Sequence, residues 1–194
     1  FSVFTMVLKK HSKVIGWDDG PFEFGEREMV PLVGVVTRGG DQVDGVLKTE
    51  VEVDGLDATT TLITTINGSK HSQELQLIIL DGITFGGFNV VDIKKLANET
   101  DIPVLAVTRK KFDLQAIKKA LGNLANFERR WEAVLNAGDS DYAKVRGSKI
   151  YFQTASLSVE EAKQAISITT TYSSLPEPVR LADMIARAIV SGES

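Results

Sequence analysis

The chain of 194 residues is 43% hydrophobic and 25% charged, with a net charge of −4 at pH 7, which suits a single globular domain over residues 1–194. It has no cysteine and only two histidines, so disulfides, iron–sulfur clusters, thiolate zinc sites and cysteine nucleophiles are excluded, and any metal must bind mostly to oxygen, as Mg²⁺, Mn²⁺ and Ca²⁺ do. The lack of a membrane-length apolar run or a signal pattern predicts a cytoplasmic protein with no membrane partner, and the start at Phe1 indicates a trimmed or partial chain.

The first half of the chain predicts three strands, a helix and a fourth strand. Apolar runs at 13–17 and 29–37 stop at turn residues, and 45–53 alternates between apolar and charged side chains, as a half-exposed strand does. Asp57 then precedes apolar residues at helical spacing and is expected to cap that helix. The run 75–80 is almost wholly apolar, which is typical of a central parallel strand covered on both faces.

The second half predicts a strand–helix–strand unit and then mostly helices. A glycine-rich turn leads into a helix over 90–97 and a buried strand over 103–107. The remaining elements are helices at 113–121, 128–135 and 159–168, a short strand at 150–152 and a last helix ending near Val190. Three antiparallel strands followed by parallel crossovers describe an α/β protein with a mixed five-stranded sheet of the ribonuclease H-like kind, flanked by helices.

Carboxylates follow two of the predicted strands. Asp18 ends the first strand and Asp81 ends the fourth, and ligands of open α/β sheets bind beyond the carboxyl ends of parallel strands. If these strands are neighbours, both carboxylates reach one divalent ion. Because successive side chains of a strand point to opposite faces, only one of Asp18 and Asp19 can join Asp81 directly. A turn role for Asp81 is the alternative, since Asp-Gly is a common turn dipeptide.

A third carboxylate is expected from the end of the third strand or from the helix after it. Asp54 and Asp57 both qualify, and position does not separate them. The structural alternatives are a turn role for Asp54 and a capping role for Asp57. His71 lies in a polar loop and His11 among lysines, so both are expected to be exposed and not to bind metal.

The charge is unevenly distributed along the chain. Between Arg109 and Arg130 there are seven basic and two acidic residues, a local charge of +5, so the rest of the chain carries −9. A basic face that holds nucleic acid and a merely solvated helix face both fit this segment. Near the C-terminus, Arg180 and Asp183 lie three residues apart on one face of the last helix, where they could stand at the edge of the site.

Four stretches resemble a known family and occur in the family's order over roughly residues 14 to 187. They are Val14-Ile15-Gly16-Trp17-Asp18, Leu80-Asp81-Gly82 with its glycine turn, Pro103 to Arg109, and Leu175 to Asp183. The sequence is similar to the archaeal endonuclease V-like family of uncharacterised proteins, and more distantly to endonuclease V itself. The resemblance implies a ribonuclease H-like nuclease that cleaves a phosphodiester bond of DNA or RNA with Mg²⁺ or Mn²⁺.

The resemblance also assigns roles to residues. Asp18 and Asp81 match the two central, catalytic metal ligands, Asp183 matches the group on the last helix that completes the metal site, and Arg109 falls where endonuclease V has a lysine near the scissile phosphate. Asp54 or Asp57 would replace the family's glutamate. The segment 39–51 has no match to the family's proline–tyrosine wedge, and Phe88-Asn89-Val90 stands in place of its histidine–proline–arginine element.

Two other functions compete with a nuclease. The first is a non-catalytic module on the same fold that holds DNA or RNA with steep salt dependence through Arg109, Lys110, Lys111, Lys118 and Lys119. Arg180 is a further expected contact to nucleic acid. The second is a small-molecule or nucleotide site in the glycine turn from Gly82 to Asn89. That turn lacks the spaced glycines and lysine of a phosphate-binding loop, so it ranks last.

Overall fold

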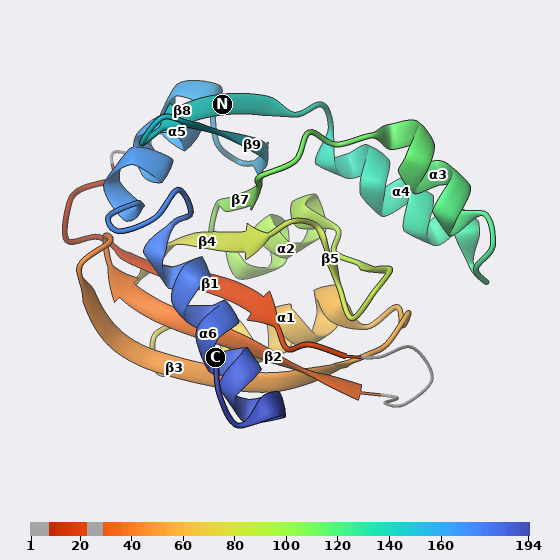
Figure 1. The fold of residues 1–194 in the computed structure, drawn as a ribbon, viewed down its shortest axis with the longest axis horizontal. Helices are drawn as coiled ribbons and strands as arrows, with labels where there is room; N and C mark the ends of the chain where they lie inside the picture. Colours follow the sequence, from red (N-terminus) through yellow and green to blue (C-terminus); the bar gives the residue numbers. More distant parts are fainter. Residues whose placement is uncertain (1–7, 23–28) are drawn as a thin grey trace.

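The computed structural model describes residues 8–22 and 29–194 of the chain. In this part of the chain, seven strands form one mixed sheet with the order β3-β2-β1-β4-β7-β9-β8 (Figure 1). Two short strands, β5 and β6, pair separately in the glycine turn. The strands are β1 Lys13–Asp19, β2 Met29–Arg38, β3 Gln42–Glu52, β4 Leu75–Asp81, β5 Thr84–Phe85, β6 Asn89–Val90, β7 Val104–Thr108, β8 Asp141–Val145 and β9 Ser148–Ala155.

The strand directions confirm the expected topology. β1, β2 and β3 are joined antiparallel, whereas β4 runs parallel to β1 and β7 runs parallel to β4. The apolar residues Leu77 to Leu80 of β4 are buried, as expected for a central strand covered on both faces. The mixed α/β sheet flanked by helices therefore agrees with the fold class expected from the sequence.

The sheet has seven strands where the sequence indicated five. The short strand expected at 150–152 extends over Ser148–Ala155 and pairs with both β7 and an additional strand, Asp141–Val145. No apolar run in the sequence predicts this additional strand. Its hairpin turn places Arg146 and Gly147 at φ of 51° and 80°, a geometry that Asn-Gly pairs usually signal.

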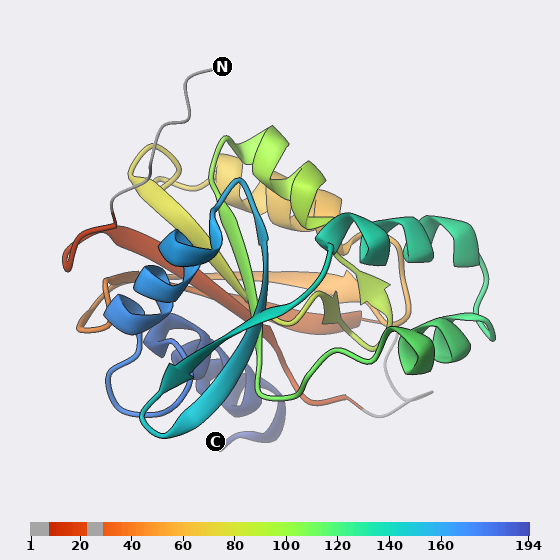
Figure 2. The ribbon, with the colours of Figure 1, turned by 90° about the horizontal axis from the view of Figure 1, so that it is seen from above.

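Helices cover both faces of the sheet (Figure 2). α1 (Ala58–Asn67), α2 (Ile93–Thr100) and α4 (Phe127–Ala137) contribute to the core on one face, and α3 (Leu114–Leu121) packs beside α4. α5 (Val159–Thr169) and α6 (Glu177–Ser191) cover the other face. None of the helices in the described ranges is long and apolar enough to cross a membrane.

α6 lies directly on β1 because a glycine faces it. A Cβ atom added to Gly16 would lie 2.4 Å from the carbonyl carbon of Pro178, closer than real side chains approach backbone. Gly16 therefore lets the first turn of α6 touch the strand. As a result, α6 runs across β1 and β2 (Figure 1). Its Asp183 lines the same hollow as Asp18 and Asp19 at the carboxyl end of β1.

The polar loop before β4 differs from expectation. His11 is exposed as expected, but His71 is only 7% exposed, so its assignment as an exposed residue is wrong. A Cβ atom added to Gly45 would meet the His71 ring at 2.5 Å from Nε2, which shows how closely the ring packs on β3. The absence of a side chain at Gly45 makes room for the imidazole, and local polarity does not reveal this.

Candidate active site

Asp18 and Asp81 meet at the carboxyl ends of two neighbouring parallel strands. The β1–β4 register pairs Trp17 with Leu80, so the next residue of each strand, Asp18 and Asp81, lies at the same edge of the sheet. Asp18 is only 7% exposed, and its side chain is within hydrogen-bonding reach of Asp81. The structure thus brings together the two carboxylates that the sequence placed at strand ends.

The electrostatics of this pair are unfavourable without a cation. Burial raises the pKa of Asp18 to about 9, and the charges of Asp81, Asp19 and Asp183 add to the effect. Burial also raises the pKa of Asp81, although its hydrogen bond with Asp18 and the positive charge of Arg109 oppose the rise. A buried and a half-buried carboxylate in contact need a shared proton or a cation between them, so the pair is prepared to accept positive charge.

Two further carboxylates flank the pair. Asp19 Oδ2 accepts a hydrogen bond of 2.6 Å from the Gly86 amide, and burial raises the pKa of Asp19 to about 6. Asp183 reaches the cluster from α6 and forms an ion pair with Arg187, with 2.7 Å between Arg187 Nε and Asp183 Oδ1. Because side chains alternate along a strand, the sequence pattern placed Asp18, and not Asp19, beside Asp81. Arg187 was missed, although its position one helical turn beyond Asp183 could have signalled it.

The acidic cluster separates two hollows of similar size. One, of about 320 Å³, is bounded by the three strand-end carboxylates, by Thr108 and by the aromatic rings of Phe88 and Phe112. The other, of about 340 Å³, adds Asp183 and Arg187 to the same three carboxylates. Within the described ranges, no three carboxylate or imidazole side chains are already arranged as a complete metal-binding group.

Asp54 and Asp57 lie outside this cluster and are bound elsewhere. Asp54, at a φ of 51°, accepts a hydrogen bond of 2.8 Å from the Phe88 amide. Asp57 accepts one of 2.5 Å from the Asn89 side chain and makes no capping bond to α1, contrary to the expected cap. Neither residue lines either hollow. The structure therefore does not bring the expected third ligand, Asp54 or Asp57, to the Asp18–Asp81 pair.

The glycine turn is likewise occupied by the protein's own acceptors. The amides of Gly86 and Phe88 donate to Asp19 and Asp54, and the Val91 amide donates to the Ile83 carbonyl. A phosphate-binding turn needs free amides that point at the ligand. The structure thus gives no support to a nucleotide site in this turn.

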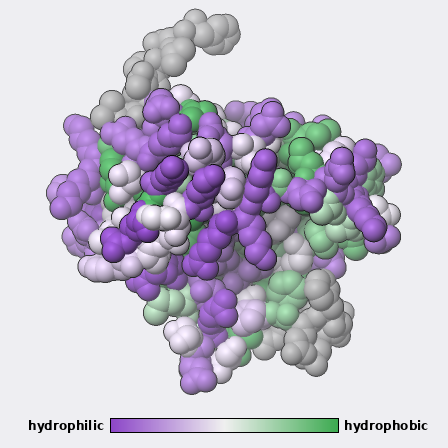
Figure 3. Space-filling view, turned by 45° about the horizontal axis from the view of Figure 1, so that its top comes forward, coloured by the Kyte–Doolittle hydropathy of each residue, from purple (hydrophilic) through white to green (hydrophobic). Residues whose placement is uncertain are grey.

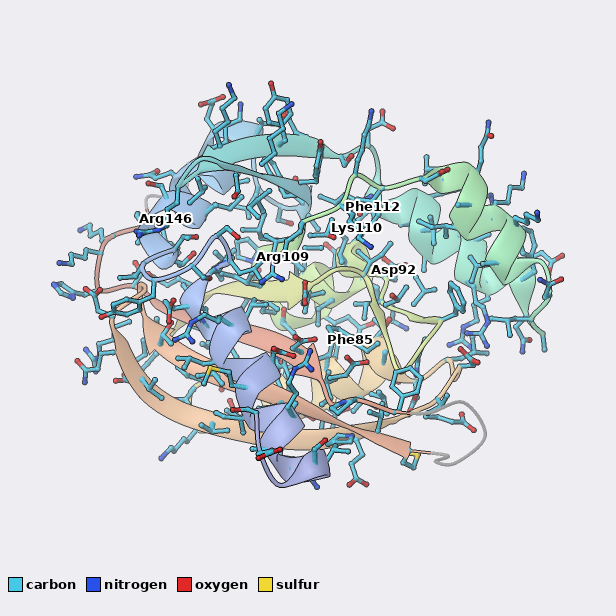
Figure 4. The ribbon with its side chains drawn as sticks, in the orientation of Figure 1. Phe85, Asp92, Arg109, Lys110, Phe112 and Arg146 are labelled. Carbon is cyan, nitrogen blue, oxygen red and sulfur yellow. The ribbon has the colours of Figure 1, made fainter. Side chains whose placement is uncertain are left out.

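The first part of the basic segment faces the acidic cluster. Arg109, Lys110 and Lys111 directly follow β7 and are exposed, and Arg109 is close enough to lower the pKa of Asp81. Figure 4 shows Arg109 and Lys110 near the carboxyl end of β4, far from Arg146 at the turn of the β8–β9 hairpin. Among the cations expected to contact nucleic acid, these three stand at the acidic edge of the sheet.

Two other basic residues have structural partners. Arg180 forms an ion pair with the buried Glu177, with 2.8 Å between Nη2 and Oε2. Arg130 is only 4% exposed and donates to backbone carbonyls, so it does not belong to a solvated basic face. The basic surface is therefore smaller than the charge count indicated.

The raised pKa of Asp18 predicts how pH affects the stability of the metal-free protein. In the unfolded chain Asp18 ionises near its ordinary pKa of 3.8, but in the folded chain it does so near 9. Protonated Asp18 therefore does not reduce the free energy of unfolding below about pH 4. The free energy of unfolding then falls as the pH rises from about 4 towards 9, because only the unfolded chain ionises readily. We expect Asp18→Asn to raise the free energy of unfolding by about 1 to 3 kcal/mol at about pH 8 in the presence of a chelator.

Urea unfolding of both proteins at about pH 5 and about pH 8 measures this difference. The gap between Asp18→Asn and the wild type should widen at the higher pH. Added Mg²⁺ should narrow it by stabilising only the wild type, because the ion favours the ionised carboxylate. An equal difference in the free energy of unfolding at both pH values would contradict a raised pKa for Asp18.

Comparison with known proteins assigns the chain to a family. Residues 10–190 match the family described as Endonuclease dU. A UPF0215 protein of Methanothermobacter thermautotrophicus is 45% identical over 188 residues, covering 96% of this chain and 92% of that protein. A protein of unknown function from Archaeoglobus fulgidus has a similar crystal structure, with a TM-score of 0.84, 41% identity and coverage of 93% of this chain and 99% of the other.

A more distant structural neighbour has a nuclease name. Endonuclease V of Ciona intestinalis, solved with a 24mer DNA containing an inosine followed by a ribo-adenosine, has a TM-score of 0.62 at 15% identity. The alignment covers 93% of this chain and 86% of that one. At this identity the likeness concerns the fold alone, and it agrees with the ribonuclease H-like architecture expected from the sequence.

Proposed function

Because the chain belongs to the endonuclease dU family, we propose that it is a metal-dependent nuclease that hydrolyses phosphodiester bonds of DNA or RNA. The observation that carries this proposal is the pair of the buried Asp18 and the half-buried Asp81 at the carboxyl edge of β1 and β4. When both carboxylates are ionised, such a pair destabilises the fold unless a cation compensates it, and strongly perturbed carboxylates of this kind are characteristic of functional sites. Arg109 beside it supplies a positive charge for a phosphate.

The residues present fit Mg²⁺ or Mn²⁺. All donors are carboxylate oxygens, and Mg²⁺ commonly binds one or two protein carboxylates and completes its shell with water and substrate phosphate oxygens. The absence of a complete three-residue group within the described ranges is compatible with this mode of binding. Asp18 and Asp81 would hold the ion, and Asp183 would approach from α6. When bound, such an ion activates water and neutralises charge on the phosphate.

The protein's own side chains would then position the substrate. Arg109 orients the phosphate next to the carboxylates, with Lys110 and Lys111 holding the neighbouring backbone. The ion pair of 2.7 Å with Arg187 would hold the Asp183 carboxylate in one orientation. Asp19, fixed by the Gly86 amide, adds negative charge next to Asp18 and strengthens the attraction for a cation.

A cleavage assay with and without metal tests the proposal. The purified protein is incubated with labelled single-stranded and duplex DNA and RNA, including oligonucleotides that contain deoxyuridine or inosine. We expect cleavage with Mg²⁺ or Mn²⁺, complete loss on chelation and recovery on adding metal back. Salt-dependent binding without cleavage of any substrate would instead favour the non-catalytic binding module.

A further inference from the structure

The outer face of the β8–β9 hairpin carries an unusual group of side chains. Tyr142 stands opposite Tyr151, and Lys144 stands opposite Lys149, so all four project from the same side of the two strands. We call this group the tyrosine–lysine face. The opposite side of the hairpin is buried against α5 through Ala143 and other apolar residues. The hairpin thus has one structural face and one that the core does not use.

The tyrosine–lysine face is open to solvent and carries uncompensated charge. Tyr142 is 43% exposed, and both lysines are exposed. The two tyrosine rings lie 6.2 Å apart at 54°, and Lys149 Nζ lies 4.7 Å from the centre of the Tyr142 ring. Within the described residues neither lysine forms an ion pair with a carboxylate. Like charges directly opposite each other in a hairpin are unfavourable unless an anion compensates them.

The tyrosine–lysine face adjoins the candidate active site. The β7–β9 register pairs Tyr151 with Thr108, which immediately precedes Arg109. Next on the same side of β9 comes Gln153, which lines a hollow of about 700 Å³ together with Phe112. Phe112 also lines the hollow that contains Asp18 and Asp81. Phe112 therefore borders both hollows, and Tyr151 lies on the strand next to the one that leads into Arg109.

Figures 2 and 3 place this surface in the molecule. In Figure 2 the β8–β9 hairpin lies across the front of the sheet, with α3 and α4 on one side and α5 on the other. Figure 3 shows mainly hydrophilic side chains on this side of the molecule and hydrophobic ones gathered towards α3 and α4. The hairpin is thus accessible from the side of the molecule on which Arg109 and Lys110 lie.

We propose that the tyrosine–lysine face is a stacking platform for a single-stranded segment of the nucleic acid whose phosphate is held at Arg109. The inference rests on the proposed nuclease function and specifies how its substrate is held. Bases stack on exposed tyrosine rings whatever their sequence, while lysines beside the rings contact the backbone. Duplex DNA keeps its bases stacked within the helix, so the platform selects unpaired strands next to the cleaved bond.

Binding measured in the Asp81→Asn protein tests the platform without any contribution from cleavage. The probes are fluorescein-labelled oligothymidylate and oligouridylate, and fluorescence anisotropy gives the affinity. We expect Tyr142→Ala to weaken binding roughly fivefold to hundredfold, whereas Tyr142→Phe retains the ring and most of the affinity. The matched control is Tyr172→Ala, because Tyr172 is 73% exposed before α6 and outside the platform. Circular dichroism confirms that each variant is folded.

The lysines give an independent readout. Replacing Lys144 and Lys149 with alanine should reduce the slope of log affinity against log salt concentration by the amount expected for about two phosphate contacts. Replacing the exposed Lys70 and Lys94 with alanine should leave this slope unchanged. Affinity unchanged in Tyr142→Ala, or lowered equally by Tyr172→Ala, would overturn the platform even if the wild type cleaves. Tyr142-dependent binding by a wild type that never cleaves would support the platform and reject the nuclease.

Discussion

Replacing Asp81 with asparagine is expected to reduce cleavage at least about a thousandfold while leaving the protein folded. Asparagine has nearly the same shape, but it lacks the negative charge that would hold a divalent ion beside Asp18. Removal of that charge also relieves the repulsion that, together with burial, raises the pKa of Asp18. The variant should therefore be at least as stable as the wild type when metal is absent.

The measurement compares initial rates of cleavage with titration calorimetry of Mn²⁺. Asp81→Asn should lose both cleavage and tight Mn²⁺ binding. The matched control is Asp101→Asn, since Asp101 is exposed after α2 at a φ of 56°, a conformation that asparagine readily adopts. Cleavage by Asp81→Asn at the rate of the control would rule out the proposed role of the carboxylate pair.

The second large effect is expected at Arg130, the buried cation of α4. Its guanidinium donates to four backbone carbonyls, with distances of 3.0 Å to Ala125, 2.8 Å to Gly55, 2.5 Å to Phe88 and 2.5 Å to Asp54. These bonds tie α4 to the loop after β3 and to the glycine turn. Arg130→Met would leave the carbonyls without donors, so we expect a loss of about 2–4 kcal/mol in the free energy of unfolding.

The adjacent Arg129 provides the control for this prediction. Arg129 is exposed on the same helix, so Arg129→Met should change the free energy of unfolding by less than about 0.5 kcal/mol. Urea denaturation of the two variants measures both values. Because the glycine turn also fixes Asp19 through Gly86, Arg130→Met should reduce cleavage at temperatures where the protein is still folded. Equal stability of the two variants would show that the carbonyls find other partners.

Periodicity predicted much of the fold because most elements have one strongly apolar face. The almost wholly apolar run at 75–80 became the central strand β4, and the last helix, expected after Pro178 and up to about Val190, became most of α6. Local patterns failed where pairing or packing with another segment decides the structure. β8 is held by pairing with β9, and His71 is buried because Gly45 lacks a side chain.

The sequence by itself determined that any metal must bind to oxygen, that carboxylates end two strands, and that a basic segment follows the strand before Arg109. Those properties follow from composition and from the two-residue repeat of strands, which are local. Only the tertiary structure decided which acids gather. It separated Asp54 and Asp57, held by Phe88 and Asn89, from the Asp18–Asp81 pair, and it brought Asp183 in on α6.

The same distinction applies to the basic residues. Arginine and lysine carry the same charge in the sequence whether they face water, a carboxylate or a carbonyl. The structure buried Arg130 among backbone carbonyls, paired Arg180 with Glu177, and left Arg109 beside Asp81. Burial and partners depend on contacts between distant segments, and these contacts decide whether a cation stabilises the fold or remains free for a phosphate.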